Sequence, residues 1–345
     1  MVRYTIIERA PAAFQQPVPL EQIQAMCQRA FGKDRSILSI EELAGGGHNN
    51  TYRILLAAMP PVILRVSPAH GPHLAQHELN LMRNEQYMQP FLAPIAPLMP
   101  RTLMVDFTHQ LIKRDYIFQT FMEGELWSDI EHELTLEEDL ALYRQLAELT
   151  KIIHGVEGET FGQPLVGHTF DRWSSLVVHK LESSIRDLEA IPLDATDVRA
   201  LLDLVMAHLD LLDQIDRPRL LHGDLWTFNV LVKRDPAQHV PTISAVLDSD
   251  RCWWGDPLAD WTMFLLHIRA TESPDPKVVA GTRAFWQTYA DAEPDPGAQF
   301  RSHVYHAMSF CDARIELQRR QSHERVRQTY QRIQEIRDAL CTCGA

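Results

Sequence analysis

Features that would assign this 345-residue chain to a membrane, secreted or repeat class are missing from its sequence. No apolar run approaches the ~18 residues that a membrane-spanning helix needs, and the N-terminus lacks the apolar core of a signal peptide. There is neither an internal repeat nor a low-complexity tract. The five cysteines are scattered and odd in number, which is typical of reduced thiols. These absences predict a cytoplasmic globular protein with no membrane partner.

Basic residues are also in deficit. The chain has 33 lysines and arginines against 46 aspartates and glutamates, a formal net charge of −13. An acidic protein is poorly suited to nucleic acid or to an anionic membrane, so neither is expected as a partner. The balance is compatible with a cationic small-molecule substrate, and equally with solubility alone. The length allows one large domain or two lobes, each with its own core.

Polar residues interrupt two apolar runs within the stretch 220–261, which reads LLHGDLWTFNVLVKRDPAQHVPTISAVLDSDRCWWGDPLADW. Asp224 and Asn229 lie in a polar turn, a short strand begins at Asn229, and a second strand at 243–247 ends on Asp248. Two strands joined this way should pair antiparallel, which brings Asn229 and Asp248 to one edge, with Asp224 just before it. Three hard oxygen donors in one place suit Mg²⁺ that is shared with phosphate oxygens. The stretch therefore predicts a magnesium site.

The pattern elsewhere is β-rich at first and helical later. Strands are predicted at 36–43, 51–56, 62–66 and 116–122, and helices in the same part at 19–31 and 74–88. A further helix begins at Thr135, which can form a capping box with Glu138, and ends at Gly155. More helical segments are predicted at 172–213, 261–268, 278–289 and 300–340, with loops at 90–100 and 158–171. This distribution predicts an α+β fold.

A glycine-rich loop, Gly45-Gly46-Gly47-His48-Asn49-Asn50, joins the first two of these strands. Glycines without a Cβ let backbone N–H groups approach an anion closely, so the loop is a candidate phosphate cover. The third glycine of the dinucleotide-binding fingerprint is missing, and no helix follows directly. A plain hairpin turn explains the same residues.

Arg65 lies within the apolar strand 62–66, where a charge needs either a partner or an exposed face. The next predicted helix offers Glu78, with Glu85 two turns further on. An Arg–Glu pair would hold the guanidinium towards a phosphate, a role that suits its geometry. A surface arginine on an edge strand is the alternative.

The three acidic and amide residues of the polar stretch fit the requirements of phosphoryl transfer. This reaction needs a base or orienter for the acceptor hydroxyl, metal ions on the nucleotide phosphates, and cationic donors for the spread charge. Asp224 suits the first role, and Asn229 with Asp248 the second. Arg65 and the backbone of the loop 45–47 suit the third.

Other polar residues of the stretch are expected to be structural. His222 is expected to set the loop by hydrogen bonding rather than to act as a base. Asp260 is expected to cap the helix 261–268, and Asp256 to steady the turn before it. Asp250 either sits near the metal or faces a cationic acceptor.

The segments HGDLWTFN and VLDSDRCWWGDPLAD together resemble the aminoglycoside phosphotransferase family, part of the protein-kinase-like superfamily of small-molecule kinases. The family pattern is H-G-D-x-x-x-x-N, then an aspartate that ends an apolar strand, then G-D-P-x-x-D. In the N-terminal half, GGGHNNTYRI resembles the nucleotide loop, VILRVSP the strand with the phosphate-binding cation, and FQTFMEGELW the hinge. The resemblance covers about residues 36–270, and the order and spacing of the whole set make it specific.

This resemblance implies roles for particular residues. Asp224 would be the catalytic base, and Asn229 and Asp248 the magnesium ligands. Arg65 would contact the nucleotide phosphates and Glu78 would position it, although many members of the superfamily have lysine at the place of Arg65. The full set implied to bind the nucleotide is Gly46, Gly47, His48, Asn49, Asn50, Arg65, Glu78, Gln119, Phe121 and Met122.

The resemblance also implies a two-lobed, protein-kinase-like organisation and a reaction. A nucleotide-binding lobe with an N-terminal helix would occupy 1–122, and a helical lobe with the catalytic loop, metal site and acceptor pocket 123–345. The γ-phosphate of ATP or GTP would pass, with Mg²⁺, to a hydroxyl of an aminoglycoside-like or other antibiotic, as in a resistance enzyme. A metabolite kinase of the choline, homoserine, fructosamine or sugar type is the alternative, since HGDLW also resembles fructosamine kinases, although Gly255-Asp256-Pro257 fits the antibiotic kinases better. Neither 158–218 nor the C-terminal helices carry a readable acceptor signature.

Two further classes are weighed against a kinase. A non-catalytic pseudokinase is disfavoured, because degenerate sites usually lose at least one of the three positions that Asp224, Asn229 and Asp248 occupy. A glycosyltransferase with Asp248-Ser249-Asp250 as its metal-chelating D-x-D would leave the spacing of Asp224 and Asn229 unexplained.

Overall fold

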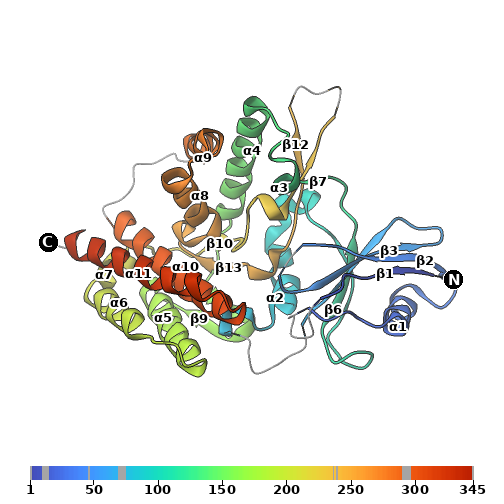
Figure 1. Cartoon of the computed structure of the whole chain (residues 1–345), viewed down its shortest axis with the longest axis horizontal. Coiled ribbons are helices and arrows are strands. Elements are labelled where there is room, and N and C mark those ends of the chain that lie inside the picture. Colours follow the sequence, from blue (N-terminus) through green and yellow to red (C-terminus); the bar gives the residue numbers. More distant parts are fainter. Residues whose placement is uncertain are drawn as a thin grey trace.

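The chain folds into a sheet-rich part and a larger helical part, at the right and left of Figure 1 respectively. The computed structural model describes residues 2–9, 15–45, 47–68, 75–235, 237, 240–289 and 297–343. The expected α+β fold, β-rich at first and mainly helical later, is confirmed. None of the helices in these ranges combines the length and apolar character that crossing a membrane requires.

Six strands form the N-terminal sheet, in the order β1-β2-β3-β4-β6-β5. Their bounds are Arg3–Thr5 for β1, Ile37–Glu42 for β2, Asn50–Leu56 for β3, Val62–Val66 for β4, Thr102–Asp106 for β5 and Tyr116–Thr120 for β6. Neighbouring strands pair antiparallel, except that β1 runs parallel to β2. The four strands expected in this part are confirmed, whereas β1 and β5 were not predicted.

Helix α1, Leu20–Phe31, covers one face of this sheet (Figure 1). Its residues Ile23 and Met26 are fully buried and belong to the same apolar cluster as Tyr52 of β3. The helix stops at Gly32, whose φ of 90° suits a residue without Cβ. The predicted helix at 19–31 is thereby confirmed.

The segment that leads from the sheet to the helical part differs from the single helix expected at 74–88. A 3-10 turn at Gln76–Glu78 comes first, and helix α2 spans only Leu81–Met88. Asn80 separates them, because its backbone is left-handed with a φ of 57°, a conformation that asparagine tolerates. The prediction of one helix was wrong, and the break places Glu78 off the helix.

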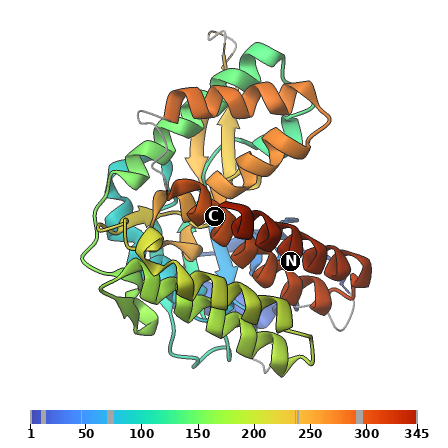
Figure 2. The same cartoon turned by 90° about the vertical axis from the view of Figure 1, so that its left-hand side faces the viewer.

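Helices make up most of the remaining chain (Figure 1, Figure 2). Helix α4, Leu136–His154, begins with the predicted capping box: Thr135 Oγ1 accepts from the backbone N–H of Glu138, whose carboxylate accepts from the N–H of Thr135. The other helices are α3 Trp127–Ile130, α5 Trp173–Ala190, α6 Thr196–Ala207, α7 Leu209–Leu212, α8 Trp261–Glu272, α9 Pro276–Tyr289, α10 Ala298–Arg319 and α11 His323–Cys343. A 3-10 segment, Gln89–Leu98, lies where a loop was expected.

The last two helices, α10 and α11, replace the continuous helix expected at 300–340. Gln321 adopts a φ of 55° between them and reverses the chain. Val304 and Cys311 of α10 are buried in one apolar cluster with Leu181 of α5 and Ile333 of α11. Helix α10 therefore lies in the core of the helical part, in contact with α5 as well as α11.

Two small sheets hold the polar stretch. Strand β11, Val230–Lys233, pairs antiparallel with β12, Thr242–Val246, which confirms the predicted hairpin, and β7, Glu125–Leu126, joins the other edge of β11. The second sheet has the order β10-β13-β8-β9, with bounds Arg219–Leu221, Trp253–Gly255, Phe161–Gln163 and His168–Phe170. The expectation of a loop at 158–171 was therefore wrong in part, because β8 and β9 are too short to show a sequence period.

Candidate active site

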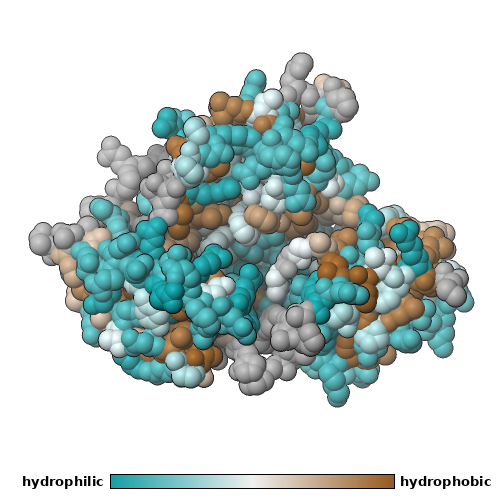
Figure 3. Space-filling model, in the orientation of Figure 1, coloured by the Kyte–Doolittle hydropathy of each residue, from teal (hydrophilic) through white to brown (hydrophobic). Residues whose placement is uncertain are grey.

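A cavity of about 1550 Å³ lies between the sheet and the helical part. Figure 3 shows the hollow between these two parts of the surface, with polar and apolar side chains around it. Residues from the glycine-rich loop, β4, the hinge and the polar stretch line it. Asp224, Asn229 and Asp248, predicted from the sequence to lie together, all face this one cavity.

Asp224 and Asn229 are joined directly. The Asn229 side-chain amide donates to Asp224 Oδ2 at 3.0 Å and to the Asp224 backbone oxygen at 2.8 Å. Both amide hydrogens are thus used, which leaves Asn229 Oδ1 as the atom available to a cation. Burial raises the pKa of Asp224 to about 7, against the opposing effect of Arg251. A carboxyl group with that pKa is suited to accept a proton near neutral pH.

Asp248 follows β12 in a left-handed backbone conformation, with φ 62° and ψ 56°. The N–H of the preceding Leu247 donates to the backbone oxygen of Asn229 at 2.8 Å, so the end of β12 lies beside the start of β11 as predicted. The Asp248 side chain is 33% exposed, towards the cavity. Burial would raise the pKa of its carboxyl, but the Arg65 and Arg251 guanidiniums outweigh that effect and lower it.

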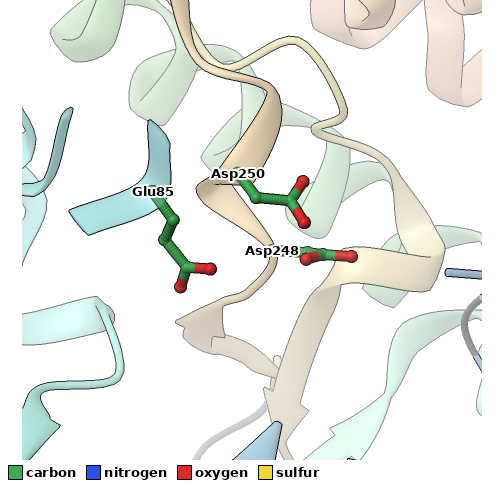
Figure 4. Close-up of side chains that lie close together, drawn as sticks. All are labelled: Glu85, Asp248 and Asp250. Carbon is green, nitrogen blue, oxygen red and sulfur yellow. The ribbon is translucent and has the colours of Figure 1, made fainter. Parts of the chain in front are cut away.

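Arg65 of β4 is surrounded by carboxylates. Its guanidinium donates to Glu85 Oε2 at 2.5 Å, to Asp250 Oδ2 at 3.3 Å and to Asp248 Oδ1. Figure 4 shows Glu85 on α2 beside Asp248 and Asp250 on the segment after β12, and oxygens of the three lie within 4.8 Å of one another. Burial lowers the pKa of Arg65, but these carboxylates outweigh it and raise it, so Arg65 remains charged.

The predicted pairing of Arg65 with Glu78 was wrong. Glu78 instead accepts from Arg319 at the end of α10, with Oε1 at 2.8 Å and Oε2 at 2.5 Å from the guanidinium. Because α2 begins at Leu81, Glu78 lies in the turn before the helix, and Glu85 faces β4 in its place. Gln119 Nε2 donates to Glu85 Oε1 at 2.7 Å and fixes this carboxylate.

Asp250 lies with the candidate metal ligands. Its side chain is buried, contacts Arg65 and accepts from Asn49 Nδ2 at 3.4 Å. Burial, followed by the repulsion of Asp248, raises the pKa of Asp250 well above its ordinary value. Of the two carboxyl groups, Asp248 is therefore the one that stays ionised.

The nucleotide-loop residues fall into different environments. Gly46 lies outside the described residues, while Gly47, His48 and Asn49 line the cavity. Burial lowers the pKa of His48 to about 4, so this imidazole is neutral at pH 7. Asn50 differs: its side chain is fully buried, donates to Glu42 at 2.8 Å and accepts from Arg114 at 2.6 Å. Asn50 thus supports the loop from behind.

The predicted hinge residues Gln119, Phe121 and Met122 line the cavity where β6 ends. Gln119 is buried and its side-chain amide donates to Glu85, whereas Phe121 and Met122 are partly exposed. The structure thus brings together the hinge, the loop and the polar stretch.

Asp260 has a larger part in the site than the expected helix cap. It occupies the N-cap position of α8 without capping it. Its carboxylate instead accepts from the backbone N–H groups of His222 at 3.0 Å and Gly223 at 2.9 Å, and from His154 Nε2 at 3.0 Å. These bonds fix the backbone just before Asp224. Asp260 and His154 are therefore positioning residues. The segment LAELTKIIHG, which contains His154, resembles the helix that opens the second lobe in the family, but no role was predicted for His154 itself.

His222 sets the loop through its backbone N–H, because neither ring nitrogen has a hydrogen-bond partner among the described residues. Asp256 steadies the turn as expected, accepting from the N–H of Leu258 at 3.1 Å. It also binds Arg301 and Tyr305 of α10, at 2.9 Å and 2.8 Å, contacts that were not predicted. The turn is thereby attached to the helical core.

Comparison with known proteins places this geometry in context. A family model described as "Phosphotransferase enzyme family" matches residues 39–300. No curated protein matches. Among solved structures, the fold is similar to a complex of a thermostable mutant of the aminoglycoside phosphotransferase APH(4)-Ia with AMP-PNP and hygromycin B, with TM-score 0.64, 18% identity, and coverage of 94% of this chain and 99% of that one. It is also similar to the GDP complex of aminoglycoside 2'-phosphotransferase-IIIa, with TM-score 0.62, 16% identity, and coverage of 92% and 98%.

Proposed function

The chain belongs to the phosphotransferase enzyme family, and from this premise we propose that it is a magnesium-dependent kinase that transfers the γ-phosphate of ATP or GTP to a hydroxyl of a small molecule. The observation that carries the proposal is the meeting of Asp224, Asn229 and Asp248 in one cavity with the buried Arg65. We assign the sheet-rich lobe, 1–122, to the nucleotide and the helical lobe, 123–345, to the catalytic loop and acceptor.

Asp224 is assigned as the base. Its carboxylate takes the proton of the acceptor hydroxyl as the acceptor oxygen bonds to the γ-phosphorus. The bond from the γ-phosphorus to the β–γ bridging oxygen breaks, and the nucleoside diphosphate leaves with that oxygen. The pKa of about 7 supports this assignment, and Asp260 supports it by fixing the backbone before Asp224.

Asn229 and Asp248 are assigned as the magnesium ligands. The donor set fits Mg²⁺, because Asn229 Oδ1 is left available by its own amide bonds and the ionised Asp248 faces the cavity. Bound there, the metal would neutralise charge on the nucleotide phosphates.

The remaining nucleotide contacts are assigned to the sheet-rich lobe. Arg65 binds the phosphates and Glu85 positions it, with Gly47, His48 and Asn49 covering them. The hinge at Phe121 and Met122 meets the purine through backbone groups.

The sequence leaves two classes of molecule as candidates for the phosphate acceptor. An aminoglycoside or other antibiotic, with resistance as the biological role, is supported by the likeness to a protein whose structure holds hygromycin B. A metabolite hydroxyl is the alternative.

The test is a nucleotide-consumption screen of the purified chain with Mg²⁺ and ATP or GTP, over antibiotics and hydroxylated metabolites. Consumption that depends on one acceptor, with phosphorylated product seen by mass spectrometry, is the expected result. Nucleotide binding by calorimetry without consumption for any acceptor would refute the kinase and favour the pseudokinase.

A further inference from the structure

Two basic side chains line the helical side of the cavity. Lys180 comes from α5, and Arg251 ends the 3-10 turn Ser249–Arg251 that follows β12. Neither side chain has an ion pair or a hydrogen bond to any residue that the structure describes. We call this side, lined by Lys180, Arg251, Trp253, Tyr305, Met308 and Asp312, the acceptor wall.

The glutamates around the acceptor wall are already paired with arginines: Glu78 with Arg319, and Glu316 with Arg320. Asp312 is the one acidic member of the wall. It lies 3.5 Å from the ring of His77 and partly offsets the charge of Lys180. Within the described ranges, the one other basic side chain of the cavity without such a pair is Arg325, which is exposed on α11. The wall therefore has an excess of positive charge despite the net charge of −13.

Lys180 is held in place by an aromatic ring. Its ammonium lies 4.2 Å from the centroid of the Trp253 ring, an attractive cation–π contact. Its side chain is partly buried, and burial lowers the pKa of the amine against the opposing charge of Asp312. A desolvated charge that forms no close ion pair with a described residue destabilises the free protein, and a bound anion would reduce that penalty.

Arg251 lies beside the proposed base. Asp250, Asp224 and Asp248 all act electrostatically on its guanidinium. Its backbone carbonyl packs against Gly223, where a Cβ would lie only 2.3 Å from the carbonyl oxygen. The close approach explains why a glycine precedes Asp224, and it locks Arg251 next to the catalytic loop. Arg251 thus lies near the reacting hydroxyl, with Lys180 in the same cavity.

We infer that the acceptor carries an anionic group, a carboxylate or a phosphate ester, which Lys180 and Arg251 bind while its hydroxyl faces Asp224. The inference rests on the proposed kinase function and deepens it. A cationic aminoglycoside would bring its ammonium groups against two unpaired cations, which costs binding free energy. The acceptor wall therefore favours an acidic hydroxylated metabolite over an aminoglycoside.

The first experiment sorts acceptors by charge. Hydroxyl compounds are screened in sets that share one sugar ring and differ in the charged substituent, such as glucose, glucuronate, glucose 6-phosphate and glucosamine, alongside hydroxy acids and aminoglycosides. The expected result is nucleotide consumption confined to anionic members, with the carboxylate and phosphate arms showing which group is bound. Consumption that is highest with neutral or cationic compounds would overturn the inference and leave the kinase intact.

The second experiment removes the charge of Lys180. With an anionic acceptor, Lys180→Met should raise the acceptor KM at least about tenfold, because it removes a charged hydrogen-bond donor. The values of kcat and nucleotide KM should change by less than about twofold, which marks a binding role. Lys113→Met, at an exposed lysine before β6, is the matched control. An unchanged or lower acceptor KM would contradict the assignment.

A binding measurement separates failure of the inference from failure of the proposed function. The chain is saturated with AMP-PNP and Mg²⁺ to fill the nucleotide site, and inorganic phosphate and acetate are titrated by calorimetry. Binding of at least one anion that is lost in Lys180→Met supports the anion site even when no acceptor is phosphorylated. Absence of binding by both would overturn the inference, whatever the outcome of the screen.

Discussion

The cations that line the cavity differ in whether carboxylates pair with them. Arg65 has three carboxylates around its guanidinium, and Glu85 is itself held by Gln119. Lys180 and Arg251 have no ion pair with any described residue, and an aromatic ring is the contact that holds Lys180. The ion pairs of Arg65 hold its guanidinium in one position and contribute to folding. A cation without such pairs can bind a ligand without breaking them. The comparison separates a cation that a phosphate can reach only in competition with carboxylates from two cations that form no ion pair with any described residue.

The largest effect, on kcat, is expected at Asp224, the proposed base. Asp224→Asn keeps the side-chain shape and removes the proton acceptor, so kcat should fall by roughly 10²–10⁴. Nucleotide affinity, measured by calorimetry, should stay close to the wild-type value. Asp203→Asn, at an exposed position of α6, is the control. A variant that keeps most of its rate would exclude Asp224 as the base.

Removing Arg65 from its three carboxylates should destabilise the fold. Arg65→Met leaves the buried Glu85 and Asp250 and the partly exposed Asp248 without their cation, which should lower the free energy of unfolding by about 3–5 kcal/mol. The nucleotide KM should rise as well. Urea unfolding followed by circular dichroism measures the first effect, with Arg53→Met as control, because Arg53 of β3 is a partly exposed arginine with a single ion pair among the described residues, to Glu41. A change below about 1 kcal/mol would mean that the network contributes little.

Asp139, a buried acid that does not line the cavity, makes stability depend on pH. Asp139 is 1% exposed, and burial raises the pKa of its carboxyl from 3.8 to about 6. Between these values the folded state binds more protons than the unfolded one, so the contribution of Asp139 to stability is present below pH 4 and lost as pH rises to about 6. Asp139→Asn should remove about 2–3 kcal/mol of this fall.

The measurement is the free energy of unfolding of wild type and Asp139→Asn at pH 4 and pH 7. Asn keeps an oxygen for the bond from Trp127 Nε1, which is 3.2 Å long. Equal pH dependence in both proteins would show that Asp139 is ionised in the fold at its ordinary pKa.

The smallest effect on stability is expected for Lys180, and it is opposite in sign to the effect of Arg65→Met. Lys180→Met removes a desolvated charge without breaking an ion pair, so the free energy of unfolding should stay unchanged or rise by up to about 1 kcal/mol. The same urea experiment serves. A loss comparable with that of Arg65→Met would mean that Lys180 supports the fold, and the contrast between the two residues would disappear.

Local sequence patterns predicted much of this architecture. The β11–β12 hairpin, the capping box of α4 and the gathering of Asp224, Asn229 and Asp248 all follow from residue spacing, because each depends on neighbours along the chain. The partner of Arg65 could not be read in this way. It depends on where α2 begins, and a single left-handed residue, Asn80, decides that.

Other features depend on distant contacts. The strands β1, β8 and β9 have three residues each, too few to show a period, and pairing with strands elsewhere in the chain defines them. That Lys180 and Arg251 form no ion pair with any residue described by the structure is a property of the folded cavity. In the sequence, both appear as ordinary charges near acidic neighbours.

The ion pair between Arg319 and Glu78 has a consequence for the order of events in the cavity. It joins the end of α10, a helix that lines the acceptor side of the cavity, to the 3-10 turn that precedes α2. Any rotation of the sheet over a bound nucleotide must carry α10 with it or break this tie. Closure of the sheet over one ligand would then also alter the acceptor side of the cavity, and any coupling that results acts by the same factor in both directions.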